Sequence, residues 1–533
     1  MKTTELDALV VGAGIAGLYQ LYRLREAGMS VRCVDAADDI GGTWHWNCYP
    51  GARVDSPSYT YQYWFSEELL NEWEWSERFV GQPEIKRYLK FVANKFDLNK
   101  DIQLNTRIKS ARWNADECRW EVIDESGSTW KVKYFISCAG MLSAPKVPPF
   151  PGHDDFKGII AHTARWPRDL DLTGKRVGVV GTGATGIQVI QTVASQVDEL
   201  FVFQRTPQYA VKMKNYPLDK EKLDYWRAQY PTLKNTVHGT FGGFEWAVTE
   251  AGWALNATYE ERMAKLEECW QDGSLKMWVG TYPEILALED MNKEASEFMR
   301  EKIRARVQDP ALFDKLVPTS YGFGTYRVPL ENGYYDVFRR DNVHIVDVKD
   351  SPIERFSENG LVVDGQEYPL DVVVLATGFD AGTGALSRMD VHGRDGRSLT
   401  ELWNKDIRSA LGLQVHGFPN LFTVAGPLAP STAFCNMTTC LQQQVDWVTD
   451  AILYMRDHNI QSMEATAQRE EEWVQHHDEV ANMTLMMKTT SWYTGANIEG
   501  KPKRLLSYIG GVDAYRQICD EIKENGYPGF ELK

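Results

Sequence analysis

The stretch that decides the fold is residues 8–17, ALVVGAGIAG, in which an apolar run ends in a glycine-rich turn. The turn has the spacing G-x-G-x-x-G, with glycines at Gly12, Gly14 and Gly17. A second apolar run, Val31–Val34, follows a helical pattern and ends at Asp35. Strand, turn, helix, strand and acid in this order are the dinucleotide-binding fingerprint.

Each part of this fingerprint has a physical task. Gly12 permits the tight turn, Gly14 lets backbone N–H groups approach a pyrophosphate, and Gly17 lets the helix pack closely on the strand. The N-terminus of the helix offers free N–H groups and a partial positive charge to the phosphates. Asp35 can accept hydrogen bonds from ribose hydroxyls, so this unit suits a dinucleotide with free ribose hydroxyls, such as FAD.

The same pattern recurs far downstream. The apolar run Val177–Val180 leads into a second turn with spaced glycines, Gly181, Gly183 and Gly186. The next predicted strand, Leu200–Phe203, leads to Arg205 and Thr206 instead of an acid. Because an arginine can bind a 2′-phosphate that an acid would repel, the second unit favours NADPH over NADH.

Other apolar runs indicate how the chain moves between the two units. Tyr134–Ser137 and Val372–Leu375 end in small residues, as expected at crossings between domains, and Leu421–Val424 would return the chain to the flavin. The charged, amphipathic stretch between them predicts a helical insertion. We therefore expect an α/β fold with two Rossmann-like dinucleotide-binding domains. The predicted boundaries are 1–150 and 380–533 for the FAD domain, 151–215 and 317–379 for the NADPH domain, and 216–316 for the helical insertion within the NADPH domain.

Composition narrows the possible partners. The chain has 533 residues, a net charge of −16 and a pI of about 5.2. Such an acidic chain repels phosphate backbones and anionic membrane surfaces, so we expect neither nucleic acid nor a membrane as a partner. The start, MKTTELDALVVGAG, lacks a signal-peptide pattern, and no apolar run approaches the roughly 20 residues that span a bilayer. We expect a cytoplasmic protein without an obligate protein partner.

The cysteines and histidines give no sign of a metal or disulfide framework. Eight cysteines are scattered along the chain, as in reduced cytosolic proteins. Cys435 and Cys440 have the C-x4-C spacing of some disulfide oxidoreductases, but they lie far from the first glycine-rich turn, so we expect two buried free thiols. His162 has no second ligand at a metal-binding spacing nearby, and we expect no metal site.

Three further stretches resemble the type I Baeyer–Villiger monooxygenases. Residues 156–167, FKGIIAHTARWP, are similar to the family signature F-x-G-x-x-x-H-x-x-x-W-P, at Phe156, Gly158, His162, Trp166 and Pro167. Residues 41–55, GGTWHWNCYPGARVD, resemble a second family fingerprint, and residues 492–502, WYTGANIEGKP, resemble its C-terminal loop. The resemblance spans most of the chain and is nearest to the cyclohexanone, phenylacetone and steroid monooxygenases.

The resemblance implies an enzyme that uses FAD, NADPH and O2 to oxidise ketones to esters or lactones. The reaction would pass through a C4a-peroxyflavin and an anionic tetrahedral adduct, so a fixed cation beside the flavin should contribute much of the catalysis. Residues 321–335, YGFGTYRVPLENGYY, resemble the family segment whose arginine faces the flavin, which assigns that role to Arg327. Asp55 matches the acid that the family places beside this arginine.

One position departs from the family pattern. Tyr326 stands where members commonly have a lysine that helps to hold the 2′-phosphate. A tyrosine carries no positive charge, so selection of NADPH would depend more on Arg205 and Thr206.

The resemblance also implies the remaining site residues. Trp492 matches the loop tryptophan that closes over the nicotinamide, and His162 takes a linker role that couples domain movement to turnover. The catalytic candidates are Arg327 and Asp55. The cofactor-binding candidates are Gly12, Gly14, Gly17, Asp35, Thr43, Trp44, Asp55, Tyr61, Met437, Gly181, Gly183, Thr185, Gly186, Gln188, Arg205, Thr206, Arg327 and Trp492. The ketone pocket is expected at Leu428, Ser431, Thr432, Ala433 and Phe434.

Three other functions share parts of this pattern. An N- or S-oxygenating flavin monooxygenase has both dinucleotide units, although Trp166 and the pair Asp55 and Arg327 argue against it. An NADPH oxidase or disulfide reductase would use Cys435 and Cys440. A non-catalytic flavin-binding module would bind FAD without consuming NADPH.

Overall fold

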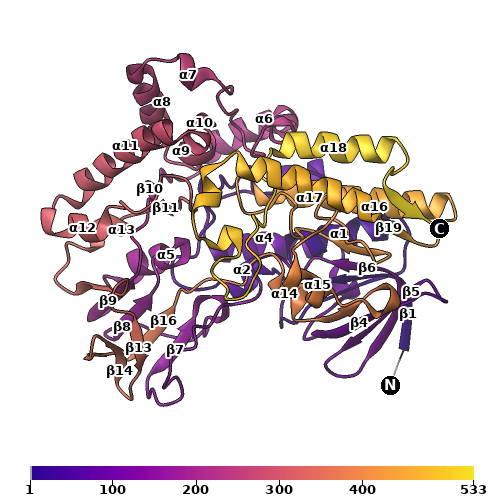
Figure 1. The fold of residues 1–533 in the computed structure, drawn as a ribbon, viewed down its shortest axis with the longest axis horizontal. Coiled ribbons are helices and arrows are strands. Elements are labelled where there is room, and N and C mark those ends of the chain that lie inside the picture. Colours follow the sequence, from indigo (N-terminus) through magenta and orange to yellow (C-terminus); the bar gives the residue numbers. More distant parts are fainter. Residues whose placement is uncertain (1–2) are drawn as a thin grey trace.

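Two sheets, each carrying one of the glycine-rich turns, form the framework of the protein (Figure 1). The computed structural model describes residues 3–533. The larger sheet has eight strands in the order β17-β4-β5-β6-β1-β2-β3, with β18 paired to β6. The smaller sheet has five parallel strands in the order β12-β9-β8-β16-β7. The predicted α/β fold with two Rossmann-like dinucleotide-binding units is confirmed.

The strands of the two sheets come from interleaved parts of the chain. The larger sheet contains β1 (Thr3–Val11), β2 (Val31–Val34), β3 (Ile102–Gln103), β4 (Ile108–Asn114), β5 (Arg119–Asp124), β6 (Thr129–Ser137), β17 (Asp390–His392) and β18 (Leu421–Thr423). The smaller sheet contains β7 (Ile159–His162), β8 (Arg176–Val180), β9 (Glu199–Gln204), β12 (Val343–Asp347) and β16 (Val372–Leu375). Smaller ladders pair β10 (Val211–Lys212) with β11 (Leu330–Glu331), β13 (Ile353–Phe356) with β14 (Gly360–Val363) and β15 (Gln366–Pro369), and β19 (Met463–Ala465) with β20 (Phe530–Leu532).

Several strands are longer than their apolar runs predict. β1 begins at Thr3 and β6 at Thr129, whereas the sequence predicts strands only from Ala8 and Tyr134. The first five residues of β1 are exposed or half-buried, and those of β6 alternate between half-buried and buried. The last four residues of both strands are buried. An apolar run therefore marks the buried half of such a strand and misses the half that faces water on one side.

The glycines of both turns are required by close approaches of the backbone. A Cβ atom on Gly12, where φ is +108°, would lie 2.4 Å from the carbonyl oxygen of Cys138. One on Gly17 would lie 1.7 Å from the carbonyl oxygen of Gly12. The second turn repeats this geometry, because a Cβ atom on Gly186 would lie 2.1 Å from the carbonyl oxygen of Gly181. Each helix thus packs directly against the turn that precedes it.

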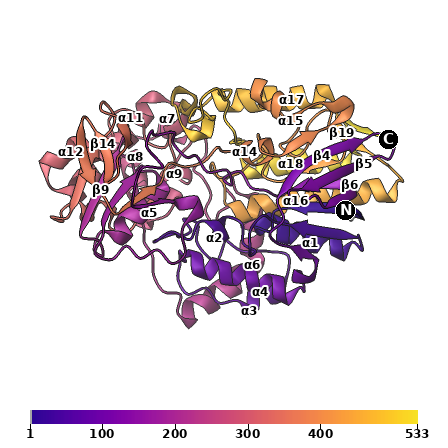
Figure 2. The ribbon, with the colours of Figure 1, turned by 90° about the horizontal axis from the view of Figure 1, so that it is seen from below.

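Helices cover both sheets and connect them. α1 (Ile15–Glu26) follows the first turn and α5 (Ala184–Val193) follows the second. The C-terminal part returns to the larger sheet, where α16 (Met437–Asp457) packs along α1 and α18 (Val512–Glu524) packs along α16 (Figure 1). The other α-helices outside residues 216–316 are α2 (Thr43–Trp46), α3 (Glu67–Glu72), α4 (Gln82–Lys95), α13 (Tyr334–Val337), α14 (Gly384–Ser387), α15 (Leu399–Lys405) and α17 (Ala467–Asn482). Viewed from below, the two sheets lie at opposite ends of the molecule with α2 and α14 between them (Figure 2).

The stretch 216–316 is helical, but it packs against both sheets. It contains α6 (Lys220–Gly239), α7 (Trp253–Asn256), α8 (Tyr259–Asp272), α9 (Lys276–Val279), α10 (Glu284–Ala287), α11 (Glu289–Val307) and α12 (Phe313–Leu316). The buried side chains of α6 join the core of the larger sheet, whereas those of α8 and α11 join the core of the smaller sheet. Its position as an insertion in the NADPH domain, and the predicted domain boundaries, stay predictions.

Polar contacts also tie this helical stretch to the larger sheet's side. Arg78 donates a hydrogen bond of 2.8 Å to the carbonyl oxygen of Asp272 and forms an ion pair with its carboxylate at 3.1 Å. Tyr59 donates through its hydroxyl to Glu245 at 3.2 Å. Burial raises the pKa of Glu245 to about 7. The helical stretch therefore links the two halves of the molecule.

One expectation about the cysteines is wrong. Cys435 and Cys440 are joined by a disulfide, where the sequence predicts two free thiols. Cys440 lies in the first turn of α16 and Cys435 lies just before that helix, so one helical turn brings the two sulfur atoms together. The other six cysteines are free.

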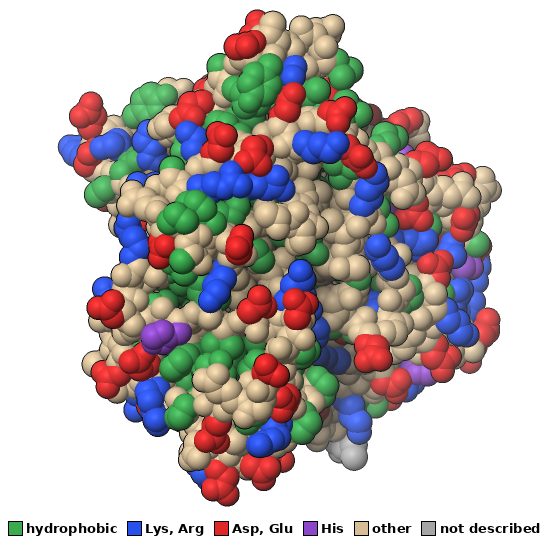
Figure 3. Space-filling view, turned by 60° about the vertical axis from the view of Figure 1, so that its left-hand side comes forward, with side chains coloured by type: hydrophobic (Ala, Val, Ile, Leu, Met, Phe, Trp, Pro, Cys, Tyr) green, Lys and Arg blue, Asp and Glu red, His purple; other side chains and the backbone are tan. Residues whose placement is uncertain are grey.

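The surface mixes charges of both signs. On the face in Figure 3, acidic and basic side chains are interspersed and hydrophobic side chains form small groups. The net negative charge is therefore not gathered into one patch on this face. Between residues 3 and 533, no helix is long and apolar enough to cross a membrane.

Candidate functional site

A single large cavity joins the two glycine-rich turns. Its volume is about 1350 Å³, and it is bounded by the carboxyl ends of β1, β2, β8 and β9. The predicted cofactor residues that line it are Gly12, Gly14, Asp35, Thr43, Trp44, Asp55, Tyr61, Gly181, Gly183, Thr185, Gln188, Arg205, Thr206, Arg327, Met437 and Trp492. Gly17 and Gly186 lie behind it, in the packing between turn and helix. This is where a parallel α/β fold binds its ligands.

The first turn fits a dinucleotide. Asp35 follows β2, and its carboxylate accepts the backbone N–H of Ala13 at 2.6 Å and of Ala37 at 2.8 Å. These bonds fix the acid at the edge of the cavity and leave each oxygen a further lone pair for a ribose hydroxyl. Gly14 is the N-cap of α1, and no side chain caps this helix. The free N–H groups at the start of α1 are therefore open to a phosphate.

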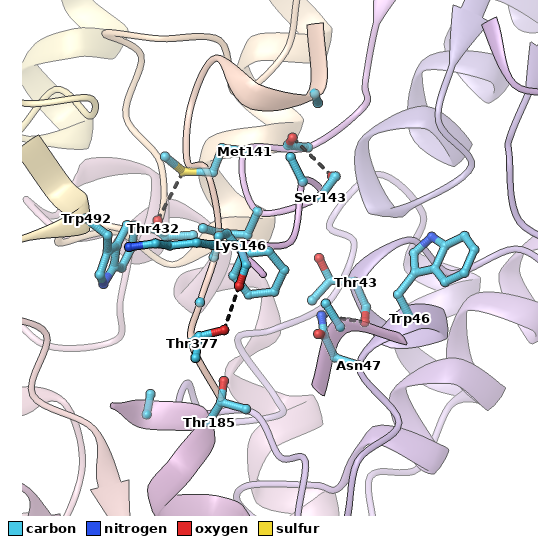
Figure 4. Close-up of a pocket in the computed structure, with 18 of the residues that line it drawn as sticks. Thr43, Trp46, Asn47, Met141, Ser143, Lys146, Thr185, Thr377, Thr432 and Trp492 are labelled. Carbon is cyan, nitrogen blue, oxygen red and sulfur yellow. Dashed lines mark hydrogen bonds between the residues drawn. The ribbon is translucent and has the colours of Figure 1, made fainter. Parts of the chain in front are cut away.

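The floor of the cavity on this side is made of aromatic side chains. Trp44 donates through its indole N–H to the hydroxyl of Tyr61 at 3.1 Å, and the two rings meet edge to face. Thr43, at the start of α2, lies across the cavity from Trp492 (Figure 4). These residues give an aromatic, partly polar wall, a surface that suits a flavin ring.

The second turn offers the same backbone donors and, at its edge, positive charge. Gly183 caps α5, and a Cβ atom there would meet no heavy atom within 4 Å, so the turn opens freely on the cavity. Thr182 donates to the carbonyl oxygen of Thr206 at 2.9 Å, which holds the segment after β9 beside the turn. Arg205 is exposed and has no hydrogen bond or ion pair to the rest of residues 3–533, so its guanidinium is free for a phosphate.

The loop 41–55 joins the two turns directly. Tyr49 donates to Gln188 at 2.9 Å, and Gln188 donates to the carbonyl oxygen of Arg53 at 3.0 Å. At Gly51, where φ is +82°, a Cβ atom would lie 2.5 Å from the carbonyl oxygen of Gln188. This second fingerprint is thus the place where the loop after β2 rests on α5.

Arg327 and Asp55 meet at the centre of the cavity. The guanidinium of Arg327 donates to the Asp55 carboxylate and, at 2.8 Å, to the carbonyl oxygen of Thr432. The exposed fractions of the two side chains are 19% and 22%. Burial disfavours the charged form of Arg327, but the field of Asp55 outweighs it, so the pKa of Arg327 lies above its usual value. Arg327 is therefore a permanent cation.

Sequence reasoning missed two of the aromatic side chains behind Arg327, those of Trp278 and Tyr493. The guanidinium of Arg327 lies 5.8 Å from the centre of the Trp278 ring, and the Trp278 ring lies 4.9 Å from that of Phe434. Tyr493 is 1% exposed; burial raises its pKa to about 12, although Arg327 lowers it. Trp278 comes from the helical stretch, where its spacing indicates only core, whereas Tyr493 adjoins the expected Trp492 and could have been included with it.

A lysine on the cavity wall was also missed. Lys146 follows β6 and is half-buried, and its ammonium donates to the carbonyl oxygen of Asn497. Burial lowers the pKa of Lys146, and the charge of Arg205 lowers it further. In Figure 4, Lys146 and Trp492 lie on one side of the cavity, with Thr377 near the Lys146 backbone. The stretch SAPKVPP carries no motif that could have identified this lysine.

The signature histidine is fixed where the chain crosses between the sheets. His162 ends β7; its Nε2 lies 3.2 Å from the carbonyl oxygen of Lys146, which also accepts the Thr377 hydroxyl at 2.6 Å. Burial lowers the pKa of His162. The signature glycine, Gly158, has no room for a Cβ atom, which would lie 2.5 Å from the carbonyl oxygen of Asp371. Phe156 and Trp166 are buried, and these four residues, with Pro167, lie outside the cavity.

The residues expected to form the ketone pocket are mostly turned away from the cavity. Only Thr432 of the five lines it, and its hydroxyl donates to the sulfur of Met141 at 3.1 Å. Ser431 is buried against Ser507, with their hydroxyls 2.7 Å apart. The others, Leu428, Ala433 and Phe434, are also buried. Tyr326 lines the cavity, and its hydroxyl donates to the carbonyl oxygen of Thr490 at 2.8 Å.

Two dinucleotide turns on one cavity, with a buried cation between them, define an oxidoreductase with two nucleotide sites. A family model for flavin-binding monooxygenase-like proteins matches residues 7–221. The chain is 53% identical to an acetone monooxygenase (methyl acetate-forming) from Gordonia sp. (strain TY-5), over 100% of both chains. It is 40% identical to a Baeyer–Villiger monooxygenase from Pseudooceanicola batsensis, over 98% of this chain and 95% of that one.

The fold is also shared with a solved structure. A crystal structure of OTEMO in complex with FAD and NADP superposes with a TM-score of 0.95 at 39% identity, over 99% of both chains. The chain belongs to the Baeyer–Villiger monooxygenases, as the resemblance predicts. No group of His, Cys, Asp or Glu side chains within residues 3–533 is arranged to hold a metal ion.

The open space at Gly183 gives a direct test of the second turn. Alanine fits the backbone there, since φ is −73° and ψ is −172°, but its methyl group would project where a pyrophosphate approaches. We expect Gly183→Ala to fold and bind FAD normally but to raise the KM for NADPH by roughly tenfold, the effect of losing about 1.4 kcal/mol of binding free energy. Gly239→Ala, which also meets no neighbour but lies at the end of α6, is the control. An unchanged KM for NADPH in Gly183→Ala would contradict the assignment.

Proposed function

We propose that this protein oxidises small acyclic ketones, acetone among them, to esters, with FAD, NADPH and O2 as co-reactants. The observation that carries the proposal is the Arg327–Asp55 pair between two dinucleotide turns. Bound FAD and NADPH supply the hydride transfer and the activation of O2, which no amino-acid side chain can supply. The chain's own residues bind these groups, orient the ketone and stabilise charge.

Arg327 stabilises the negative charge that develops on oxygen when the ketone carbonyl is attacked. A permanent, partly buried cation that is already in place does this without reorganisation, which is why such groups contribute strongly to catalysis. Asp55 and the carbonyl oxygen of Thr432 hold the guanidinium from two directions. Asp55 is therefore a positioning residue that also tempers the field of Arg327.

The C-terminal loop excludes water from the reacting centre. Trp492 lines the cavity and its ring lies 4.0 Å from that of Tyr493, which is fully buried. The loop is fastened to the cavity wall by Lys146, through the carbonyl oxygen of Asn497. A loop that closes over the nicotinamide keeps water away from the reacting groups and so limits side reactions.

The proposed preference for small ketones rests on two supports. The acetone monooxygenase is a relative with 53% identity over the whole chain. Behind Arg327, the side chains of Trp278, Phe434 and Tyr493 are 4%, 6% and 1% exposed, and such a closely packed group leaves little room for a bulky ketone on that side. We place the small ketone between this aromatic group and the flavin side of the cavity.

Lys146 replaces the cation that the family commonly has at the position of Tyr326. Lys146 and Arg205 line the same cavity and are close enough for each charge to be felt by the other. The ammonium of Lys146 has a neutral carbonyl partner and no carboxylate, so its charge is available to a phosphate. We assign both residues to the 2′-phosphate of NADPH.

A cytoplasmic location and activity without a protein partner are part of the proposal. Six of the eight cysteines are free, as in proteins of a reducing compartment, and Cys435–Cys440 is the one disulfide within residues 3–533. Both glycine-rich turns and the Arg327–Asp55 pair line one cavity of this chain.

A product screen tests the proposed function. With NADPH and O2 supplied, we expect methyl acetate from acetone, and a higher kcat/KM for acetone and butanone than for phenylacetone. Cyclohexanone and a thioether, methyl phenyl sulfide, complete the panel. Sulfoxide without any ester or lactone would overturn the proposal in favour of an S-oxygenating enzyme.

Replacing Arg327 distinguishes the reduction of the flavin by NADPH from the later formation of the ester. In Arg327→Ala we expect NADPH to reduce the flavin still, while ester formation falls on the order of 10²–10³-fold, because only the oxygen-insertion step develops negative charge at this position. Arg327→Lys retains a charge without the planar fork and should recover part of the activity. Ester formation at the normal rate in Arg327→Ala would show that another group stabilises the charge.

The assignment of Lys146 predicts a change in cofactor preference. Lys146→Met and Arg205→Met should each raise the KM for NADPH by roughly 10–100-fold, the effect of losing one charged hydrogen bond, and change the KM for NADH much less. Tyr326→Lys should lower the KM for NADPH. Lys157→Met removes an exposed lysine outside the cavity and serves as the control. If the KM values for both nucleotides rise together in Lys146→Met, the lysine does not recognise the 2′-phosphate.

A further inference from the structure

A second cavity lies on the far side of the larger sheet's helices, apart from the nucleotide cavity. It has a volume of about 380 Å³ and is formed by α1, α16 and α18, which lie side by side in both ribbon views (Figures 1 and 2). The side chains that line it are Arg23, Gln443, Asp446, Trp447, Asp450, Arg516, Cys519, Asp520 and Lys523. None of them takes part in the proposed reaction.

Most of the charges in this cavity are already paired. Asp446 accepts hydrogen bonds from Arg23 and, at 2.7 Å, from the hydroxyl of Tyr19. Asp450 lies 3.5 Å from the guanidinium of Arg23 and 3.3 Å from the ammonium of Lys523. The same ammonium lies 3.4 Å from Asp520. Arg23 and Lys523 therefore contact all three carboxylates, although they bring two positive charges to three negative ones.

Arg516 and Gln443 are the groups left without partners. Gln443 is 4% exposed, and neither its amide nitrogen nor its amide oxygen has a hydrogen-bond partner. Arg516 makes no hydrogen bond or close ion pair with residues 3–533, and its Nε is buried. Buried polar atoms nearly always have a hydrogen-bond partner in native proteins, so a buried amide and a buried Nε without partners are costly. The two groups therefore indicate a missing polar partner.

The residue that faces Arg516 from α6 does not supply that partner. Burial, and then the charge of Arg516, lower the pKa of His238 to about 4. A histidine with this pKa is neutral near pH 7 and carries no negative charge. Burial also lowers the pKa of Arg516, although Asp520 opposes this effect, so an added anion would stabilise the guanidinium.

We propose that this cavity binds a small carboxylate that carries a hydrogen-bond donor next to the carboxylate group. The planar carboxylate accepts two parallel hydrogen bonds from Arg516, the geometry that a guanidinium matches best. The adjacent donor serves the amide oxygen of Gln443, and the amide nitrogen donates back to the ligand. A hydroxyl or an ammonium group could be this donor, and the cavity volume admits a molecule of a few heavy atoms.

The site is linked to the nucleotide cavity by one helix. Gln443 lies in α16, whose first residue, Met437, lines the nucleotide cavity. Both sites therefore depend on the position of the same rigid element.

Binding is tested on the FAD-loaded enzyme without ketone or NADPH, so the result does not depend on the proposed activity. Isothermal titration with glycolate and with glycine distinguishes a hydroxyl from an ammonium donor, and acetate and inorganic phosphate are the comparison ligands. We expect glycolate or glycine to bind saturably and roughly tenfold or more tighter than acetate, the effect of one further hydrogen bond. Absence of saturable binding by both, or equal binding of phosphate, overturns the proposal.

Substitutions locate the binding site. Arg516→Met and Gln443→Leu should each abolish the titration signal, whereas Arg456→Met, which removes an exposed arginine at the far end of α16, should leave it unchanged. Thermal unfolding gives a second measurement: the bound ligand should raise the Tm of the parent enzyme and of Arg456→Met only. Without ligand, Arg516→Met should not lower the Tm, because it removes an unpaired charge. Persistence of binding in both cavity variants would place the ligand elsewhere.

Discussion

The guanidinium of Arg327 is mostly buried and needs a carboxylate partner, which is Asp55. This ion pair determines where the two halves of the molecule meet. Arg327 comes from the segment before β11 on the smaller sheet's side, and Asp55 comes from the loop after β2 on the larger sheet's side. Removing one partner would leave the other charge unpaired in a site where the two side chains are only 19% and 22% exposed. The ion pair therefore stabilises the contact between the two halves at this point, and both of its residues line the nucleotide cavity.

The other contacts between the halves follow from this meeting. The loop 41–55 rests on α5 through Gly51 and the Tyr49–Gln188 hydrogen bond. His162 and Thr377 both contact the carbonyl oxygen of Lys146, so the crossings that follow β6, β7 and β16 share one anchor. A shift of one sheet relative to the other would strain these contacts together. The family signature thus marks a junction and not a reacting group.

The sequence predicts the parts of this structure that depend on local pattern. Apolar runs followed by spaced glycines identify both turns, because the required close backbone approaches leave no alternative residue at positions such as Gly12 and Gly186. Family motifs led to Arg327 and Asp55, which are 272 residues apart and which no local pattern could pair. What the sequence could not show depends on three-dimensional proximity. Lys146 reaches the cavity from an unremarkable loop, Trp278 reaches Arg327 from a helix that appears purely structural in sequence, and Cys435 pairs with Cys440 through one helical turn.

The order of the strands along the chain has a consequence for biosynthesis. β18, near residue 421, completes the larger sheet beside β6, and α16 then covers α1. Every strand of the smaller sheet precedes it in the chain. During translation the smaller sheet can assemble while the larger sheet still lacks its last strand and its covering helix. Until α16 has been synthesised, the apolar face of α1 that it covers stays exposed. Such exposed apolar surface is what chaperones bind during folding.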